Sequence, residues 1–308
     1  MTQFDFYLNN LSFKKQDNIT IEVLREKIEQ FATDYEFIRE QENERVYRHD
    51  SIYEEIFFDD YTVSEICNIP EIGKTTIGRD YQAYLQNIIH YSENTTLDNE
   101  EIIELLESHE ENLINGILCL HKISGIDENF CVYDKNDWFR FHRYFFCIYP
   151  PTRNDFCLKA SPYFPNLYFN PITIPAGLNG LHTNFIEIVK TIVHHLSALN
   201  DDFFYIFNQE GMSGDRACVE LENMYRGHQV KIGASRDNNN LNELNFEFTE
   251  SSDIRILYCD LHNKFYQYFE YQIPSYAAKG NRIYFHQPIE NFLDGKVLIA
   301  RIGRHAVG

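Results

Sequence analysis

Histidine, arginine, lysine and tyrosine residues recur near the end of the chain in segments whose pattern predicts β-strands. The segment "NRIYFH" places Arg282, Tyr284 and His286 on one face of an alternating strand, and Ile283 and Phe285 on the other. An imidazole transfers protons near neutral pH, and cationic groups stabilise the negative charge of a phosphorane-like transition state. These residue types therefore predict metal-independent cleavage of RNA by its own 2′-hydroxyl.

Two other segments carry the same residue types. "ILYCDLHNK" ends a predicted strand with His262 and Lys264, and the last predicted strand places Arg301 and His305 on the face of Val297, Ile299 and Gly303. If these strands are neighbours in one sheet, their polar groups converge. The candidate catalytic residues are His262, Lys264, Arg282, Tyr284, His286, Arg301 and His305. The alternative is a structural sheet whose outward residues are polar because water covers them.

The closing segment also resembles a known protein family. The predicted order is a strand over 167–174, two helices and several antiparallel strands, ending in "NRIYF…DGKVLIARIGRH". This order is similar to the RelE/HigB toxin family, over roughly Leu261 to His305. The resemblance implies a short sheet whose basic, Tyr and His residues cut messenger RNA on the ribosome without a metal. Family members are small basic single domains, whereas this chain is long and acidic.

A second candidate site lies in "NDWFRFHRYFF", which contains the only tryptophan. Trp138, Arg140 and Arg143 could form a stacking and phosphate-binding patch for nucleic acid, because guanidinium and aromatic groups suit that role. The alternative is a core helix in which Trp138, Phe141 and Phe145 pack inward while the arginines contact water. Both interpretations stay open at this point.

No pattern predicts a metal site or a cofactor. The adjacent residues His194 and His195 point about 100° apart on a helix and cannot chelate one ion as an i, i+4 pair can. Seven cysteines without a CxxC pair argue against both a disulfide framework and a cysteine zinc site, and fit a reducing cytosol. No apolar stretch approaches the roughly 18 residues that span a bilayer, so we expect a cytoplasmic protein without membrane contact.

The predicted fold class is α+β. Residues 1–130 form an acidic, mostly helical domain in this prediction, with helices over "NITIEVLREKIEQFATDY", "GKTTIGRDYQAYLQNIIHY" and "EIIELLESHEENLINGILCL". Asp98 and Glu101 form a capping box for the last of these. Residues 131–308 form an α+β domain with helices packed on a mainly antiparallel sheet, because the connections between its late strands are too short for crossover helices.

The negative charge is concentrated in the first predicted domain. Residues 1–130 hold 28 Asp and Glu against 10 Lys and Arg, a balance of −18, whereas residues 131–308 hold 19 against 17, a balance of −2. The second domain can therefore meet RNA or a ribosome, although the whole chain is acidic. Two functions follow as hypotheses: a toxin-like or defence-related prokaryotic ribonuclease, or a non-catalytic scaffold or regulatory subunit that docks a basic protein through residues 1–130. The Asn-, Ile- and Tyr-rich composition is typical of an AT-rich prokaryotic genome.

Overall fold

The computed structural model describes residues 2–181, 184–228, 231–236, 244–265 and 280–304. The chain divides into two compact units, residues 1–144 and 145–308, so the division lies 14 residues after the predicted boundary at 130 and falls within a helix. Helices combine with mixed sheets, which confirms the α+β class. None of the described helices is both long and apolar enough to cross a lipid bilayer.

The N-terminal unit contains the predicted helices and also a parallel sheet that the sequence analysis did not predict. In the described part of this unit the strand order is β5-β2-β1-β6-β7, and every pairing in this sheet is parallel. The elements in chain order are β1 (Gln3–Leu8), α1 (Ile21–Arg39), β2 (Glu44–His49), β3 (Ile56–Phe58), β4 (Tyr61–Thr62), α2 (Val63–Asn68), α3 (Pro70–Thr76), α4 (Arg79–His90), β5 (Glu93–Thr95), α5 (Asn99–Glu107), β6 (Leu113–Leu118), β7 (Cys131–Val132) and α6 (Lys135–Ile148).

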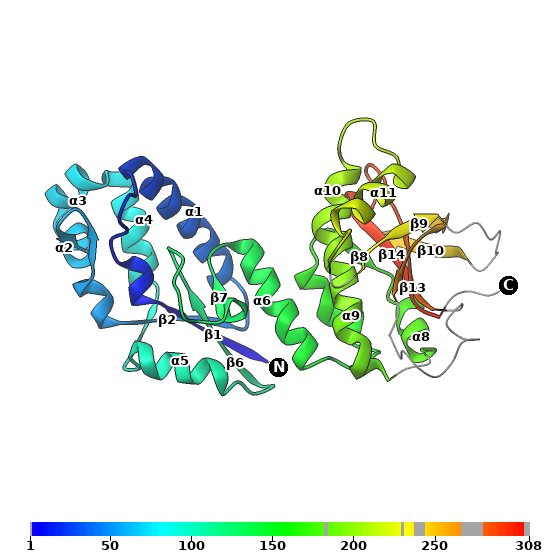
Figure 1. The fold of residues 1–308 in the computed structure, drawn as a ribbon, viewed down its shortest axis with the longest axis horizontal. Coiled ribbons are helices and arrows are strands. Elements are labelled where there is room, and N and C mark those ends of the chain that lie inside the picture. The colour runs from blue at the N-terminus through cyan, green and yellow to red at the C-terminus, as the bar shows by residue number, and fades with distance from the viewer. Residues whose placement is uncertain (1, 182–183, 229–230, 237–243, 266–279, 305–308) are drawn as a thin grey trace. The chain divides into compact units, whose positions relative to one another are not determined.

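Helices cover both faces of the parallel sheet (Figure 1). Helix α6 packs on the face of Phe6, whose ring lies 5.0 Å from that of Phe141. Helix α1 packs beside α6, since the rings of Phe37 and Trp138 lie 5.1 Å apart. Helix α5 covers the opposite face, where the Asn115 amide donates a hydrogen bond to the Leu105 carbonyl. Strands buried on both faces are mostly apolar, which explains the two Leu and two Ile residues of "LINGIL" in β6.

A local signal fixed the start of helix α5 as predicted. The Asp98 side chain accepts hydrogen bonds from the Glu100 and Glu101 backbone amides, and the Glu101 side chain accepts one from the Asp98 amide, so the predicted capping box is confirmed. Helix α5 ends at Glu107, however, and residues 113–118 of the predicted long helix form strand β6. A short apolar run has no period that separates a buried strand from a helix.

The C-terminal unit is a layered α+β structure around a five-stranded sheet, counted over the described residues. Its strand order is β8-β14-β13-β12-β9, with one parallel pair, β14 and β8, so the predicted mainly antiparallel sheet is confirmed. The elements are α7 (Phe156–Ala160), β8 (Leu167–Phe169), α8 (Thr173–Asn179), α9 (Phe185–Ala198), α10 (Phe204–Phe207), α11 (Gly214–Met224), β9 (Ala234–Arg236), β10 (Asn245–Glu250), β11 (Asp253–Tyr258), β12 (Leu261–Phe265), β13 (Asn281–His286) and β14 (Val297–Arg304).

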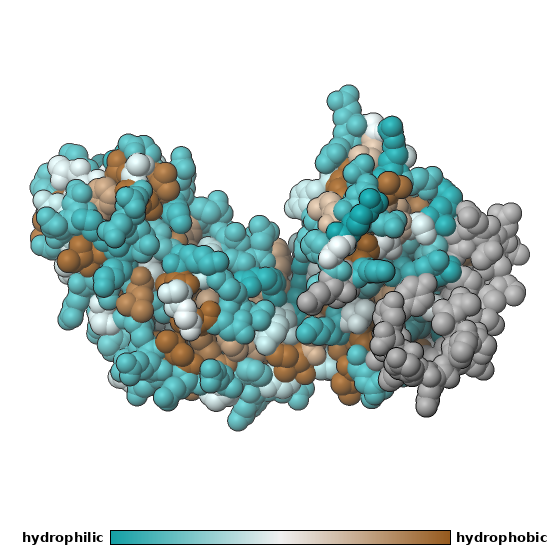
Figure 2. Space-filling view, in the orientation of Figure 1, coloured by the Kyte–Doolittle hydropathy of each residue, from teal (hydrophilic) through white to brown (hydrophobic). Residues whose placement is uncertain are grey.

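Two layers cover the two faces of this sheet (Figure 1). Helix α9 packs on the face that carries Ile283, Phe285 and Ile299, in one large apolar cluster. The hairpin of β10 and β11 covers the other face, where Phe246 and Phe248 pack in a smaller cluster with Tyr284 and Leu298. On the surface shown in Figure 2, hydrophilic residues dominate and exposed apolar residues occur in separate small groups.

Candidate functional site

The register of the C-terminal sheet brings six of the seven candidate catalytic residues to one face. His262 of β12 lies opposite Tyr284 of β13, and Lys264 lies opposite Arg282. On the other side of β13, Tyr284 lies opposite Arg301 of β14. Residues directly opposite one another share a face of the sheet. Side chains from three strands therefore meet, although they are up to 39 residues apart in the sequence.

A β-bulge in β14 places Arg301 on this face. Phe285 pairs with Ile299, and Tyr284 pairs with Arg301, so Ala300 is an extra residue in β14 between the two pairs. Strict alternation predicted Arg301 on the face of Val297 and Ile299. That prediction is wrong, because the extra residue turns Arg301 to the other face, beside Tyr284.

Two of the gathered side chains lie in the interior. Tyr284 is fully buried in the smaller apolar cluster beneath the hairpin, and His262 is 3% exposed. The rings of these two residues lie 6.1 Å apart, and His262 Nε2 lies 3.3 Å from the Ser235 hydroxyl. The hairpin removes this part of the face from solvent. A direct contact of Tyr284 or His262 with substrate, as predicted, does not fit this burial, and neither does the alternative of a sheet face covered by water.

The other gathered side chains form the rim of the same face. Lys264 is exposed, Arg301 and His286 are half-buried, and Arg282 is 9% exposed. Among the described residues, the positions of this face on β12, β13 and β14 include no Asp or Glu. The buried Nε of Arg301 has no hydrogen-bond partner in the described part of the chain. We call Lys264, Arg282 and Arg301 the basic rim.

His286 ends β13 two residues after Tyr284, on the face of the basic rim. Its Nδ1 lies 2.7 Å from the carbonyl oxygen of Gln287, which can only accept, so Nδ1 carries the proton and Nε2 keeps a lone pair. Burial lowers the pKa of His286, and the Gln287 carbonyl opposes this shift only in part. A neutral imidazole with a free Nε2 is suited to accept a proton. The seventh candidate, His305, lies outside the described residues.

The residues of the predicted nucleic-acid patch do not form an exposed surface. Trp138 is 2% exposed, and its Nε1 donates hydrogen bonds to both carboxylate oxygens of Glu44, at 2.8 and 3.0 Å. Arg143 is 7% exposed, and Arg140 forms an ion pair with Asp137 at 3.0 Å. The burial of Trp138 and Arg143 does not fit the predicted stacking patch, and Trp138 packs against Phe37 of α1. Arg140 alone reaches a cavity.

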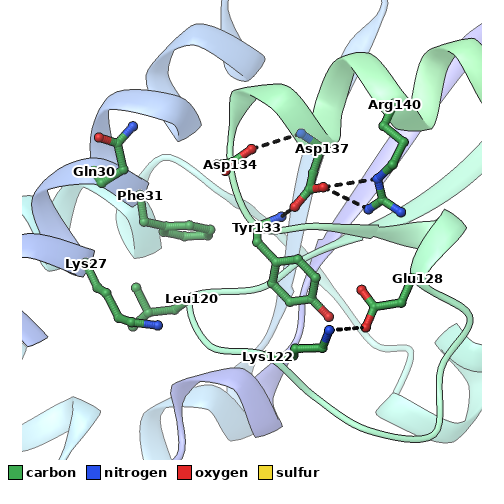
Figure 3. Close-up of a pocket in the computed structure, with 10 residues that line it drawn as sticks. All are labelled: Lys27, Gln30, Phe31, Leu120, Lys122, Glu128, Tyr133, Asp134, Asp137 and Arg140. Carbon is green, nitrogen blue, oxygen red and sulfur yellow. Dashed lines mark hydrogen bonds and ion pairs between the residues drawn. The ribbon is translucent and has the colours of Figure 1, made fainter. Parts of the chain in front are cut away.

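That cavity was missed by the sequence analysis. It has a volume of about 590 Å³ and lies within the N-terminal unit, between α1, α6 and the segments that follow β6 and β7 (Figure 3). Its charged lining residues come from four separate segments of the chain: Lys27, Lys122, Glu128, Asp134, Asp137 and Arg140. The one local signal for it was the polar segment "YDKND" that joins β7 to α6.

The histidine pair behaves as predicted from the helical spacing. His195 is 1% exposed, and its Nδ1 is hydrogen-bonded to the Asn263 side chain of β12. His194 points elsewhere on α9 and is exposed. Within the described residues, no three His, Cys, Asp or Glu side chains are grouped so that they could hold a metal ion.

Comparison with known proteins adds no relative. No protein-family model, curated protein or solved structure matches this chain. The similarity of its last segment to the RelE/HigB family therefore stays a prediction.

Proposed function

We propose that the C-terminal unit binds RNA on the basic rim and cleaves it without a metal ion. The observation that carries this proposal is the placement of Lys264 directly opposite Arg282, with Arg301 at the next pair of the sheet and no acidic side chain on that face among the described residues. All seven cysteines are free thiols, which fits the proposed cytoplasmic location of a toxin-like or defence-related effector.

Lys264 and Arg282 lie directly opposite one another, so one phosphate group can contact both cations. Arg301 is a diagonal neighbour of Arg282, at a separation of about 7 Å, which lets both guanidinium groups reach one phosphate or two adjacent phosphates. The buried Nε of Arg301, which has no hydrogen-bond partner among the described residues, would gain one from the same anion.

The chemistry assigned to His286 follows from its tautomer. Nε2 accepts the proton of the ribose 2′-hydroxyl, the 2′-oxygen attacks the adjacent phosphorus, and the bond from phosphorus to the 5′-oxygen breaks. The products are a 2′,3′-cyclic phosphate and a 5′-hydroxyl, whose proton comes from solvent. The basic rim stabilises the additional negative charge on the phosphorane-like transition state. Tyr284 and His262 act as buried supports that fix β13 beneath the rim.

The test is cleavage of a single-stranded RNA by the full chain in the presence of EDTA. We expect a 2′,3′-cyclic phosphate product, and a loss of about 100-fold or more in rate for His286→Ala, in the range for loss of a general base. His228→Ala is the matched control, since His228 is an exposed histidine of the same unit outside this face. Wild-type protein that leaves RNA and translating ribosomes intact, or equal rates for the two variants, would refute the proposal.

The predicted docking of a basic protein by residues 1–130 concerns a different part of the chain. The N-terminal unit carries 30 Asp and Glu against 13 Lys and Arg, a balance of −17, which supports such a partner. This interaction stays a prediction, independent of RNA cleavage by the C-terminal unit.

A further inference from the structure

The cavity of the N-terminal unit lies where parallel sheets place their ligands. Leu120 and Lys122 follow the carboxyl end of β6, and Tyr133 and Asp134 follow the carboxyl end of β7. In open parallel sheets, ligands bind outside the carboxyl ends of the strands, near the point where the strand order reverses. Here the order reverses between β1 and β6, because β2 lies on one side of β1 and β6 lies on the other.

Two aromatic side chains form walls of the cavity. Phe31 comes from α1, and its ring points toward Tyr133 across the opening (Figure 3). Phe31 is 4% exposed and fixed in the core of α1, whereas Tyr133 is half-buried at the rim. A planar apolar ring between them would bury area on both sides, and base–aromatic stacking contributes about 1–3 kcal/mol per base.

Two lysines form the lower edge of the cavity in Figure 3. Lys122 pairs with Glu128 at 2.9 Å, but their side chains are 77% and 45% exposed, so this pair contributes little and is easily exchanged for a ligand. Lys27 has no ion pair or hydrogen bond with any residue that the structure describes. Its charge also reaches buried His121, whose pKa is lowered to about 4 by burial and, to a smaller extent, by Lys27.

The opposite side of the cavity carries hydrogen-bonding groups that are already held in place. The Asp134 side chain accepts a hydrogen bond from the Asp137 backbone amide at 2.9 Å, which fixes the start of α6. The Gln30 side chain donates to Asp34 at 2.9 Å and keeps its carbonyl oxygen as an acceptor. Asp137 is held by Arg140. These groups can read the polar edge of a base or the hydroxyls of a ribose.

We propose that this cavity binds a nucleoside monophosphate, with the base between Phe31 and Tyr133 and the phosphate on Lys27 and Lys122. The volume of about 590 Å³ lies within the range of about 300–1,000 Å³ that small-molecule sites occupy. This site belongs to the N-terminal unit and is separate from the basic rim, so it goes beyond the proposed RNA cleavage.

The test is isothermal titration of the full-length protein with AMP, GMP, CMP and UMP. Adenosine and inorganic phosphate serve as separate probes for the two halves of the ligand. We expect at least one nucleotide to bind in the micromolar range, and each half alone to bind at least tenfold more weakly. Lys27→Glu and Tyr133→Leu should each weaken nucleotide binding at least tenfold, because one removes the phosphate contact and the other removes an aromatic wall.

Two control variants locate the binding site. Lys74→Glu makes the same charge change at an exposed lysine of α3, and Arg301→Ala removes a member of the basic rim; both should leave nucleotide affinity unchanged. The proposal is overturned if none of the four nucleotides binds at about 1 mM, if phosphate alone binds as well as the nucleotide, or if Arg301→Ala weakens binding while Lys27→Glu does not.

Discussion

Three of the buried histidines are neutral at pH 7, because their pKa is lowered. His121 and His142 belong to the N-terminal unit, and His195 belongs to α9 of the C-terminal unit; they are 4%, 2% and 1% exposed. Burial lowers the pKa of each, in spite of the Glu44 carboxylate beside His142 and the Asn263 amide beside His195. At the residue scale, protonation of these side chains therefore works against folding.

The contribution of His195 can be measured through the pH dependence of stability. The pKa of His195 is about 4 in the folded protein, against 6.5 for an ordinary histidine. Between pH 6.5 and pH 4 the unfolded chain therefore binds more protons than the folded protein. The free energy of unfolding falls as the pH decreases through this window. The difference of about 2.5 pK units corresponds to roughly 3 kcal/mol. Urea titrations at pH 7 and pH 4.5 give the free energy of unfolding at each pH. Its decrease between the two pH values should be about 2–3 kcal/mol smaller in His195→Gln than in the wild type.

His228→Gln is the control for that measurement, since it makes the same substitution at an exposed position of the same unit. An equal loss of stability on acidification in the wild type and in His195→Gln would show that His195 is protonated in the folded protein.

At the element scale, the docking of α8 against β14 sets the position of the basic rim. Gly177 of α8 lies against the backbone of β14: a Cβ atom there would stand 2.5 Å from the Ile302 carbonyl oxygen and 3.1 Å from Arg301 Cγ. A Cβ atom at Gly303 would in turn meet the Gly177 carbonyl oxygen at 2.8 Å. The two glycines allow the helix and the strand to approach at the bulge that turns Arg301 to its face.

We expect Gly177→Ala to destabilise the protein by about 1–3 kcal/mol, the usual cost of overpacking, because backbone atoms of β14 cannot move aside as a flexible side chain can. Gly180→Ala is the matched control from the end of the same helix, where the nearest atom would lie 3.4 Å from the new Cβ. Chemical denaturation of both variants checks this expectation. Similar unfolding free energies for the two would mean that α8 does not dock on β14 as closely as described.

At the scale of the whole molecule, the two units differ in formal net charge. The N-terminal unit has a balance of −17 and the C-terminal unit, with 17 Asp and Glu against 14 Lys and Arg, a balance of −3. In the proposed function, RNA is attracted to the basic rim and repelled by the acidic N-terminal unit.

This division predicts a shallow salt dependence for RNA binding. Each phosphate neutralised on a single strand contributes about −0.7 to the slope of log affinity against log salt, so three rim cations give a slope of about −2. Fluorescence anisotropy with a short labelled RNA between 50 and 200 mM salt measures it. Lys264→Ala should reduce the slope by about 0.7. Arg226→Ala, at an exposed arginine that follows α11, should leave it unchanged. A slope of −5 or steeper would place RNA on a larger surface than the basic rim.

The sequence by itself determined the features whose causes are local. Alternation fixed the two faces of β13, helical spacing fixed α1 and α9, and the side chains of Asp98 and Glu101 fixed the start of α5. Each depends on residues within a few positions of one another, so a single segment contains the information.

Only the tertiary structure decided the features that depend on distant partners. The extra residue at Ala300, which turns Arg301 toward Tyr284, exists only in the pairing of two strands. The hairpin that buries Tyr284 and His262, and the parallel sheet whose carboxyl ends form the cavity, likewise join segments far apart in the chain. Strand pairing is chosen by the burial of whole faces and not by any one strand, and for this reason the pattern of β14 alone predicted the wrong face for Arg301.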